Sequence, residues 1–150
     1  MSIWAVLLVV VCAGCTTLFD PATPIPRRGQ LIGVWEHRGP GANVAILDLK
    51  SDGTFQVHDI PPQVFALYGQ PHAGEPLDWT APVDLEGTWH TTKERSGSDP
   101  AIFFSIDPQG SVPGTITHLS VSGTGSKLHF YYVYGDPDND NRFAFDRAKG

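Results

Sequence analysis

Turn-forming residues interrupt this sequence so often that the chain has little room for long helices. Its 150 residues include 16 glycines and 13 prolines, and after residue 13 no long stretch lacks a Gly, Pro, Asn or Asp. Hydrophobic residues make up 41% of the chain, enough for one core, and charged residues only 17%. This balance is typical of a turn-rich β protein.

Short segments of β-forming residues lie between the turns. The turn sequences are SDG at 51–53, DPQG at 107–110, SGTGS at 122–126 and GDPDND at 135–140. Apolar residues alternate with other residues in the clearest segments, which places one face of each strand toward a core. These alternating sets are Ile102, Phe104 and Ile106; Leu128, Phe130, Tyr132 and Tyr134; and Phe143 and Phe145. We expect eight strands, at 31–38, 43–50, 54–59, 86–92, 101–107, 115–121, 127–134 and 142–147.

A weak internal repeat suggests how these strands are arranged. Gly33 and Trp35 begin one copy, and Gly87 and Trp89 begin the other, each followed by a loop and a second strand. A glycine allows close backbone approach, and a tryptophan two residues later supplies a large side chain on the same face. Two such meandering halves predict an antiparallel barrel that is closed or nearly closed.

Two parts of this pattern resemble known proteins. The Gly-x-Trp strand, followed by an apolar strand and DGTF at 52–55, resembles lipocalin-like (calycin) domains. The segment GDPDNDNRFAFDR at 135–147 is similar to the ending of small bacterial lipoproteins with no assigned activity. The resemblance implies a lipocalin-like barrel over 31–150, and it carries over no catalytic residues.

The start of the chain is apolar over residues 3–13, which is the length of a signal-peptide core and shorter than the roughly 20 residues of a membrane span. Ala13, Gly14 and Cys15 resemble a bacterial lipobox, although Cys12 stands where Leu is usual. The resemblance implies a signal peptide over 1–14, removed to leave a lipidated Cys15. The segment MSIW lacks the usual basic residues, so an uncleaved signal-anchor and a start further upstream remain alternatives.

Two segments without strand pattern follow. Residues 15–30 contain Pro21, Pro24 and Pro26, which favour an extended tether between the lipid and the barrel. Residues 60–85 contain five prolines and interrupt the meander. This insertion is interpreted either as a lid over a binding site or as a plug in one barrel end, and the plug is favoured.

The sequence shows none of the usual catalytic or cofactor motifs, and we expect no cofactor. Five histidines lie on expected strands, and alternation points His58, His90 and His129 to solvent, which argues against a zinc site. The acidic turn at 135–140 resembles a calcium loop only in its first residues, so we interpret it as a polar turn without metal.

The net charge is −6, and only Arg27 and Arg28 are adjacent basic residues, so no nucleic-acid-binding face is visible. We therefore expect a lipid-anchored protein on the extracytoplasmic face of the cell membrane, most simply a non-enzymatic module that binds a small apolar ligand or an envelope component. The alternative is a structural or interaction lipoprotein with a filled core; no particular protein partner is indicated. The aromatic residues that line either the cavity or the core are Trp35, Trp89, Phe104, Phe130, Tyr132 and Tyr134.

Overall fold

The chain forms an all-β structure in a computed structural model that describes residues 26–67, 75–92, 100–135, 138 and 141–149. The strands are β1 (Gly33–Arg38), β2 (Val44–Leu49), β3 (Thr54–Ile60), β4 (Val83–Thr91), β5 (Ala101–Ile106), β6 (Thr115–Ser122), β7 (His129–Val133) and β8 (Arg142–Arg147). A one-turn helix, α1 (Arg28–Leu31), precedes β1, and two 3₁₀ turns, η1 (Val64–Ala66) and η2 (Gly125–Lys127), lie in connections between strands.

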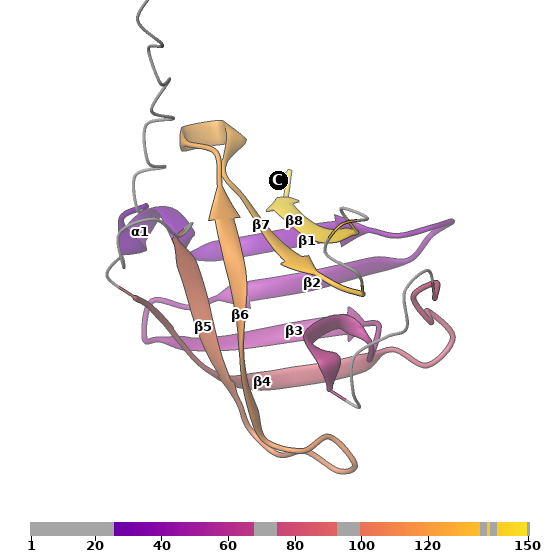
Figure 1. Ribbon diagram of the computed structural model, residues 1–150. Helices are drawn as coiled ribbons and strands as arrows, with labels where there is room; N and C mark the ends of the chain where they lie inside the picture. Colours follow the sequence, from indigo (N-terminus) through magenta and orange to yellow (C-terminus); the bar gives the residue numbers. More distant parts are fainter. Residues whose placement is uncertain (1–25, 68–74, 93–99, 136–137, 139–140, 150) are drawn as a thin grey trace, which may run out of the picture.

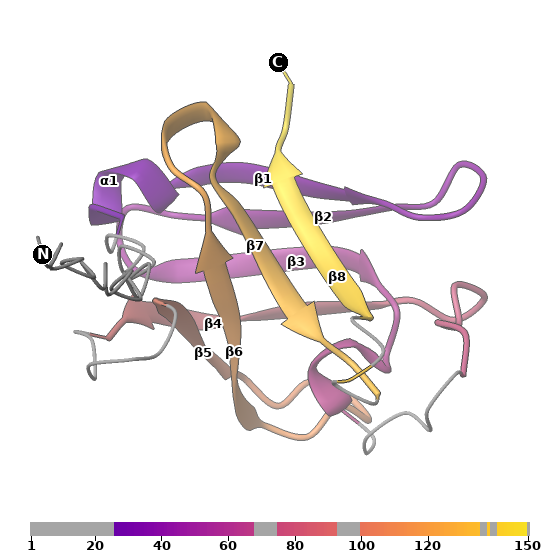
Figure 2. The same cartoon turned by 45° about the horizontal axis from the view of Figure 1, so that its top comes forward.

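Each strand pairs with its neighbours in the sequence, and the first strand pairs with the last. All eight pairings are antiparallel, and the β1–β8 pairing joins Trp35 with Arg147 and Glu36 with Asp146. The result is a closed barrel in which the strands follow one another around the wall (Figures 1 and 2). The expectation of an antiparallel meander of about eight strands is confirmed, and the architecture is consistent with a lipocalin-like barrel.

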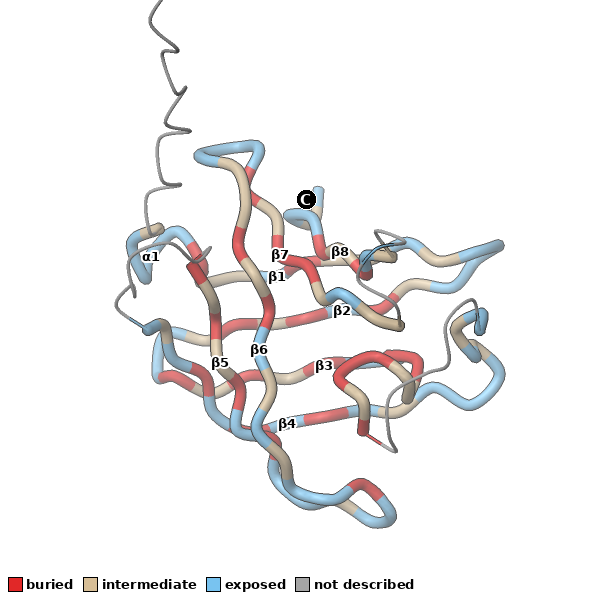
Figure 3. The backbone as a smooth tube through the Cα atoms, in the orientation of Figure 1, coloured by how far each residue is buried: buried red, intermediate tan, exposed pale blue. Residues whose placement is uncertain are grey.

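The alternating sequence pattern explains which side chains fill the barrel. In β5, Ile102, Phe104 and Ile106 are buried, whereas Ser105 between the last two is exposed. In the other strands, buried positions likewise follow less buried ones along the chain, as the colours of the tube in Figure 3 show. The buried residues form one core cluster inside the wall.

The barrel has two ends that differ in their connections. The α1 end carries α1, the β2–β3 turn, η2 in the β6–β7 connection, and the end of β8. The opposite end carries the β1–β2 connection, the β3–β4 insertion, and the β5–β6 and β7–β8 connections. The described chain therefore begins and ends at the α1 end (Figure 2).

Two sequence expectations need correction. The first strand begins at Gly33 and not at residue 31, because residues 28–31 form α1 and bury Leu31. The segment Gly87–Trp89 lies near the end of β4 and not at a strand start, because the strand already begins at Val83, opposite Ile60. Since β1 and β4 run in opposite directions, the Gly-x-Trp repeat in the sequence does not correspond to a structural repeat.

The described part of the β3–β4 insertion closes the opposite end as a plug. Val64, Phe65 and Leu67 are buried, and the Phe65 ring lies 6.0 Å from the Phe104 ring and 5.5 Å from the Tyr132 ring. In Figure 1, η1 is the coil beside the end of β3. The plug interpretation of the insertion thus fits the packing of these residues.

Candidate functional site

The aromatic residues expected to line a cavity belong to the hydrophobic core of the barrel or pack against it. Trp35, Phe104 and Phe130 are fully buried, and the Trp35 and Phe130 rings lie 4.0 Å apart. Trp89 is also buried, while Tyr132 and Tyr134 are partly buried at the edge of the core. These side chains therefore occupy part of the interior in which a lipocalin-like barrel would hold an apolar ligand.

Both core tryptophans close the α1 end in the same way, although their strands run in opposite directions. The Trp35 indole N–H donates to the Leu31 carbonyl oxygen at 2.9 Å, and the Arg147 guanidinium lies 4.1 Å above its ring. The Trp89 indole N–H donates to the Lys50 carbonyl oxygen at 3.1 Å, and the Arg28 guanidinium lies 4.9 Å above its ring. Each indole is thus hydrogen-bonded at its edge and covered by a cation.

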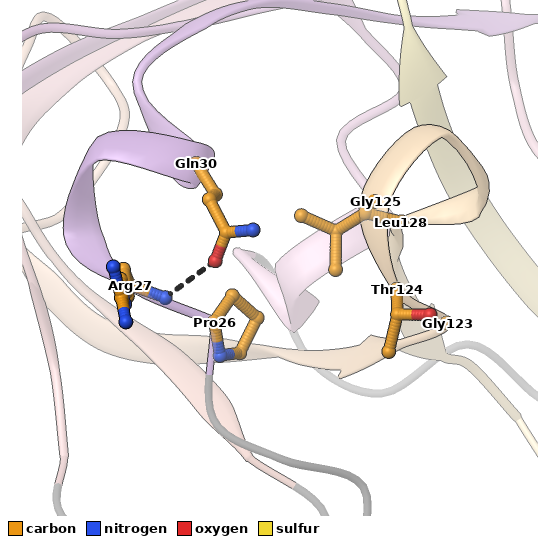
Figure 4. Close-up of a pocket in the computed structure, with 7 residues that line it drawn as sticks. All are labelled: Pro26, Arg27, Gln30, Gly123, Thr124, Gly125 and Leu128. Atoms are coloured by element: carbon orange, nitrogen blue, oxygen red, sulfur yellow. Dashed lines mark hydrogen bonds between the residues drawn. The ribbon is translucent and has the colours of Figure 1, made fainter.

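A hollow of about 290 Å³ lies at the α1 end of the barrel, between α1 and η2. Figure 4 shows Leu128 pointing into it from one side, opposite Pro26 and Gln30. The Gln30 carboxamide oxygen accepts a hydrogen bond from the Arg27 backbone N–H at 2.8 Å, which holds one rim of the hollow. The lining residues are Pro26, Arg27, Gln30, Gly123, Thr124, Gly125 and Leu128.

The hollow was not foreseen from the sequence because its two walls lie almost a hundred residues apart. The SGTGS segment at 122–126 predicted a turn, and residues 26–30 were interpreted as part of a tether. Only closure of the barrel brings α1 beside η2. A cation, a carboxamide, a hydroxyl and apolar carbons around a recess suit the head of an amphipathic molecule better than a purely apolar one.

A second hollow, of about 230 Å³, lies on the outer wall at β3 and β4. Its lining includes Lys50, Gln56, Glu86 and Asp107, of which the two carboxylates are exposed. The mixed charges around it do not favour one class of ligand.

His37 of β1 connects this strand to β8 toward the opposite end of the barrel through a hydrogen bond of its ring. Its Nδ1 lies 2.8 Å from the Ala144 carbonyl oxygen, which can only accept, so Nδ1 carries the proton of the neutral ring. The ring stacks on Phe143 at 3.7 Å and lies 5.9 Å from Trp79, which covers it from the insertion. Burial lowers the pKa of His37, with the Ala144 carbonyl and the Asp146 charge opposing the shift.

The lowered pKa of His37 predicts that acid weakens the fold. The folded protein binds a second proton on the His37 ring less tightly than the unfolded chain does. Neutral His37 therefore makes its full contribution to the free energy of unfolding above a pH of about 6.5, and this contribution is lost as the pH falls through the lowered pKa of the folded state. Urea unfolding at pH 7 and at pH 5.5 should give a lower free energy of unfolding at pH 5.5. His37→Phe should reduce that difference while keeping the ring stack, and His118→Asn should retain it because His37 is still present. An undiminished difference in His37→Phe would refute this role.

The other histidines on strands lie apart from this contact between β1 and β8. His58 and His90 are exposed, as alternation predicts, whereas His129 is partly buried. His58 Nδ1 lies 3.3 Å from an Asp84 carboxylate oxygen. Within the described ranges, no group of three or more His, Cys, Asp or Glu side chains is placed to hold a metal ion.

Several sequence predictions concern residues outside the described ranges. They include the lipidation at Cys15, the neighbouring Cys12, most of the tether, and all of the 136–140 turn except Asp138. Among the described residues, no helix is both long and apolar enough to cross a bilayer.

Comparison of the chain with protein-family models, curated proteins and solved structures finds no significant match.

Proposed function

We propose that this protein is a lipid-anchored, non-enzymatic module on the extracytoplasmic face of the cell membrane, and that it binds an envelope component with its outer surface. The observation that supports this proposal most strongly is the packing of the barrel interior, where Trp35 packs against Phe130 and Phe104 packs against Phe55 and Phe65, all of them buried. A barrel filled in this way serves as a rigid scaffold, and the hollow between α1 and η2 offers a recess on its outside.

A small apolar ligand is the second candidate, and the lining of the 290 Å³ hollow favours a ligand that is only partly apolar. Leu128 and Pro26 supply apolar surface there, but Arg27 and Gln30 share the lining. A wholly apolar ligand inside the barrel would have to displace close-packed aromatic side chains, at a cost of about 1–3 kcal/mol or more for an overfilled core. We therefore place binding on the outer surface.

The anchor is assigned to the thiol of Cys15. The lipobox resemblance of Ala13, Gly14 and Cys15 supplies the signal for lipidation at that thiol. Each buried methylene of an acyl chain contributes about 0.8 kcal/mol, so two or more chains give stable anchoring.

Cys15→Ser should release the protein from the membrane fraction and abolish its labelling by radioactive palmitate. The serine has no thiol to form the thioether, so no acyl chain is attached. Cys12→Ser is the matched control, because it removes a neighbouring thiol and should leave labelling and fractionation unchanged. A Cys15→Ser protein that stays in the membrane without label would instead support an uncleaved signal-anchor.

A further inference from the structure

Closure of the barrel gathers basic residues that are scattered in the sequence. Arg27 and Arg28 lie at α1, Lys127 lies in η2, and Arg147 and Lys149 lie at and beyond the end of β8. We call these five residues the basic end. Of these five, Arg27 lines the hollow between α1 and η2, and Lys127 belongs to η2, whose Gly125 also lines it (Figure 4).

Asp52 in the β2–β3 turn and Asp146 in β8 also lie toward this end, but within the described chain neither forms an ion pair within 4 Å with the five basic residues. Arg147 donates to the carbonyl oxygens of Ile32 and Gln30, and Arg28 donates to that of Ser51. Both guanidinium groups also lie over tryptophan rings, and neither interaction removes the charge. Among described residues, the ion pairs within 4 Å join Arg38 with Glu36 and His58 with Asp84, none of them in this set.

The opposite end of the barrel carries the contrary charge. Its connections and strand ends hold Asp59, Glu75, Asp78, Asp84, Asp107 and Asp138, against Arg38 and Arg142. The whole chain has a net charge of −6, so an anionic surface would repel it on average. Only one orientation, with the basic end leading, brings the protein to such a surface favourably.

The N-terminal chain enters the barrel at the basic end. Pro26 lines the hollow, and eleven peptide units separate it from Cys15. A chain of that length reaches at most roughly 40 Å, so a lipid on Cys15 would keep this end of the barrel within that distance of the bilayer. The strands separate the two ends by about 20 Å, which exceeds the Debye length of about 8 Å at physiological salt.

We infer that the basic end is a membrane-contact surface that binds anionic phospholipid headgroups and that includes the hollow between α1 and η2. This inference deepens the proposed function by naming the envelope component, and it takes the direction of approach from the proposed anchor. The lipid holds the protein at the membrane, while the five cations hold one orientation against it. The opposite end, which carries the acidic residues, then faces away from the bilayer.

The test uses the chain from residue 15 onward carrying Cys15→Ser, which has neither an acyl chain nor the apolar segment. This chain retains all described strand pairings, since they lie within residues 33–147. Co-sedimentation with phosphatidylglycerol–phosphatidylcholine vesicles is compared with co-sedimentation with pure phosphatidylcholine vesicles, at 50 and 500 mM salt. We expect binding to the anionic vesicles that weakens strongly at the higher salt.

Two double variants with equal loss of charge locate the surface. Each basic side chain near an anionic surface contributes roughly fivefold to partitioning, so Lys127→Gln with Lys149→Gln should weaken binding roughly 25-fold. Arg38→Gln with Arg142→Gln removes two charges from the opposite end and should change binding less than about twofold. Circular dichroism and urea unfolding confirm that each variant is folded.

Equal weakening by the two double variants, or equal binding to both kinds of vesicle, would overturn the inference. Tighter binding to a duplex oligonucleotide than to anionic vesicles, lost in the Lys127/Lys149 variant, would overturn it in favour of nucleic acid. Because the test protein carries no lipid, its outcome is independent of whether Cys15→Ser releases the full-length protein from membranes.

Discussion

Replacing Trp35 by alanine should lower the free energy of unfolding by about 3–5 kcal/mol. The substitution removes a fully buried ring that lies 4.0 Å from Phe130, and it leaves a cavity at the α1 end. It also leaves the Leu31 carbonyl oxygen without its indole donor and the Arg147 guanidinium without the ring beneath it. Urea unfolding of the chain from residue 15 onward measures the change, a large share of a domain's usual 5–15 kcal/mol.

Two other tryptophans, Trp89 and Trp79, provide a comparison for this prediction. Trp89→Ala should cost a similar amount, because Trp89 is buried and makes the same kind of hydrogen bond and cation contact. Trp79→Ala should cost much less, because Trp79 lies half-buried over His37 and Phe143. A Trp79→Ala variant as unstable as Trp35→Ala would show that the part of the insertion around Trp79 belongs to the core as much as the strands do.

Replacing Phe65 by alanine should also cost about 3–5 kcal/mol, since it empties the plug at the opposite end. Phe65 is buried and its ring packs beside Phe104 and Tyr132. Its backbone φ of 66° is in the left-handed region, where a side chain adds strain. Thermal or urea unfolding measures the loss.

Phe65→Gly separates the side chain from the backbone. Glycine leaves the same cavity but adopts the positive φ freely, so it should be more stable than alanine at this position by about 1 kcal/mol. A glycine variant less stable than the alanine variant would mean that the left-handed backbone at Phe65 does not persist in solution.

The strands could be predicted because their signal is local. Alternation of Ile102, Phe104 and Ile106 marks one buried face, and turn sequences such as SDG at 51–53 mark where the chain reverses. Closure followed from two meandering halves, although the supposed repeat is not a structural one. The Gly-x-Trp pattern at 87–89 occurs near a strand end, since backbone close approach and a large inward ring serve either end of a strand equally well.

The surfaces could not be predicted because they depend on which distant segments the barrel brings together. Arg27 and Lys127 are a hundred residues apart in the sequence, and only the pairing of β1 with β8 and of β6 with β7 makes them neighbours of one hollow. His37 was grouped with the strand histidines, yet its place at the β1–β8 seam depends on where those strands diverge. Composition and the alternation of apolar residues do not specify which distant residues become neighbours in the folded chain.

Hydrogen–deuterium exchange of the lipidated protein on phosphatidylglycerol-containing vesicles shows which end of the barrel contacts the bilayer. The account predicts that amides of residues 26–32 and 123–128, which border the hollow, exchange more slowly on the vesicles than in the unlipidated chain in solution, while residues 39–43 at the opposite end exchange at the same rate in both. Slower exchange at residues 39–43, with unchanged exchange at the residues that border the hollow, would contradict this prediction. It would show that the opposite end, and not the basic end, faces the membrane.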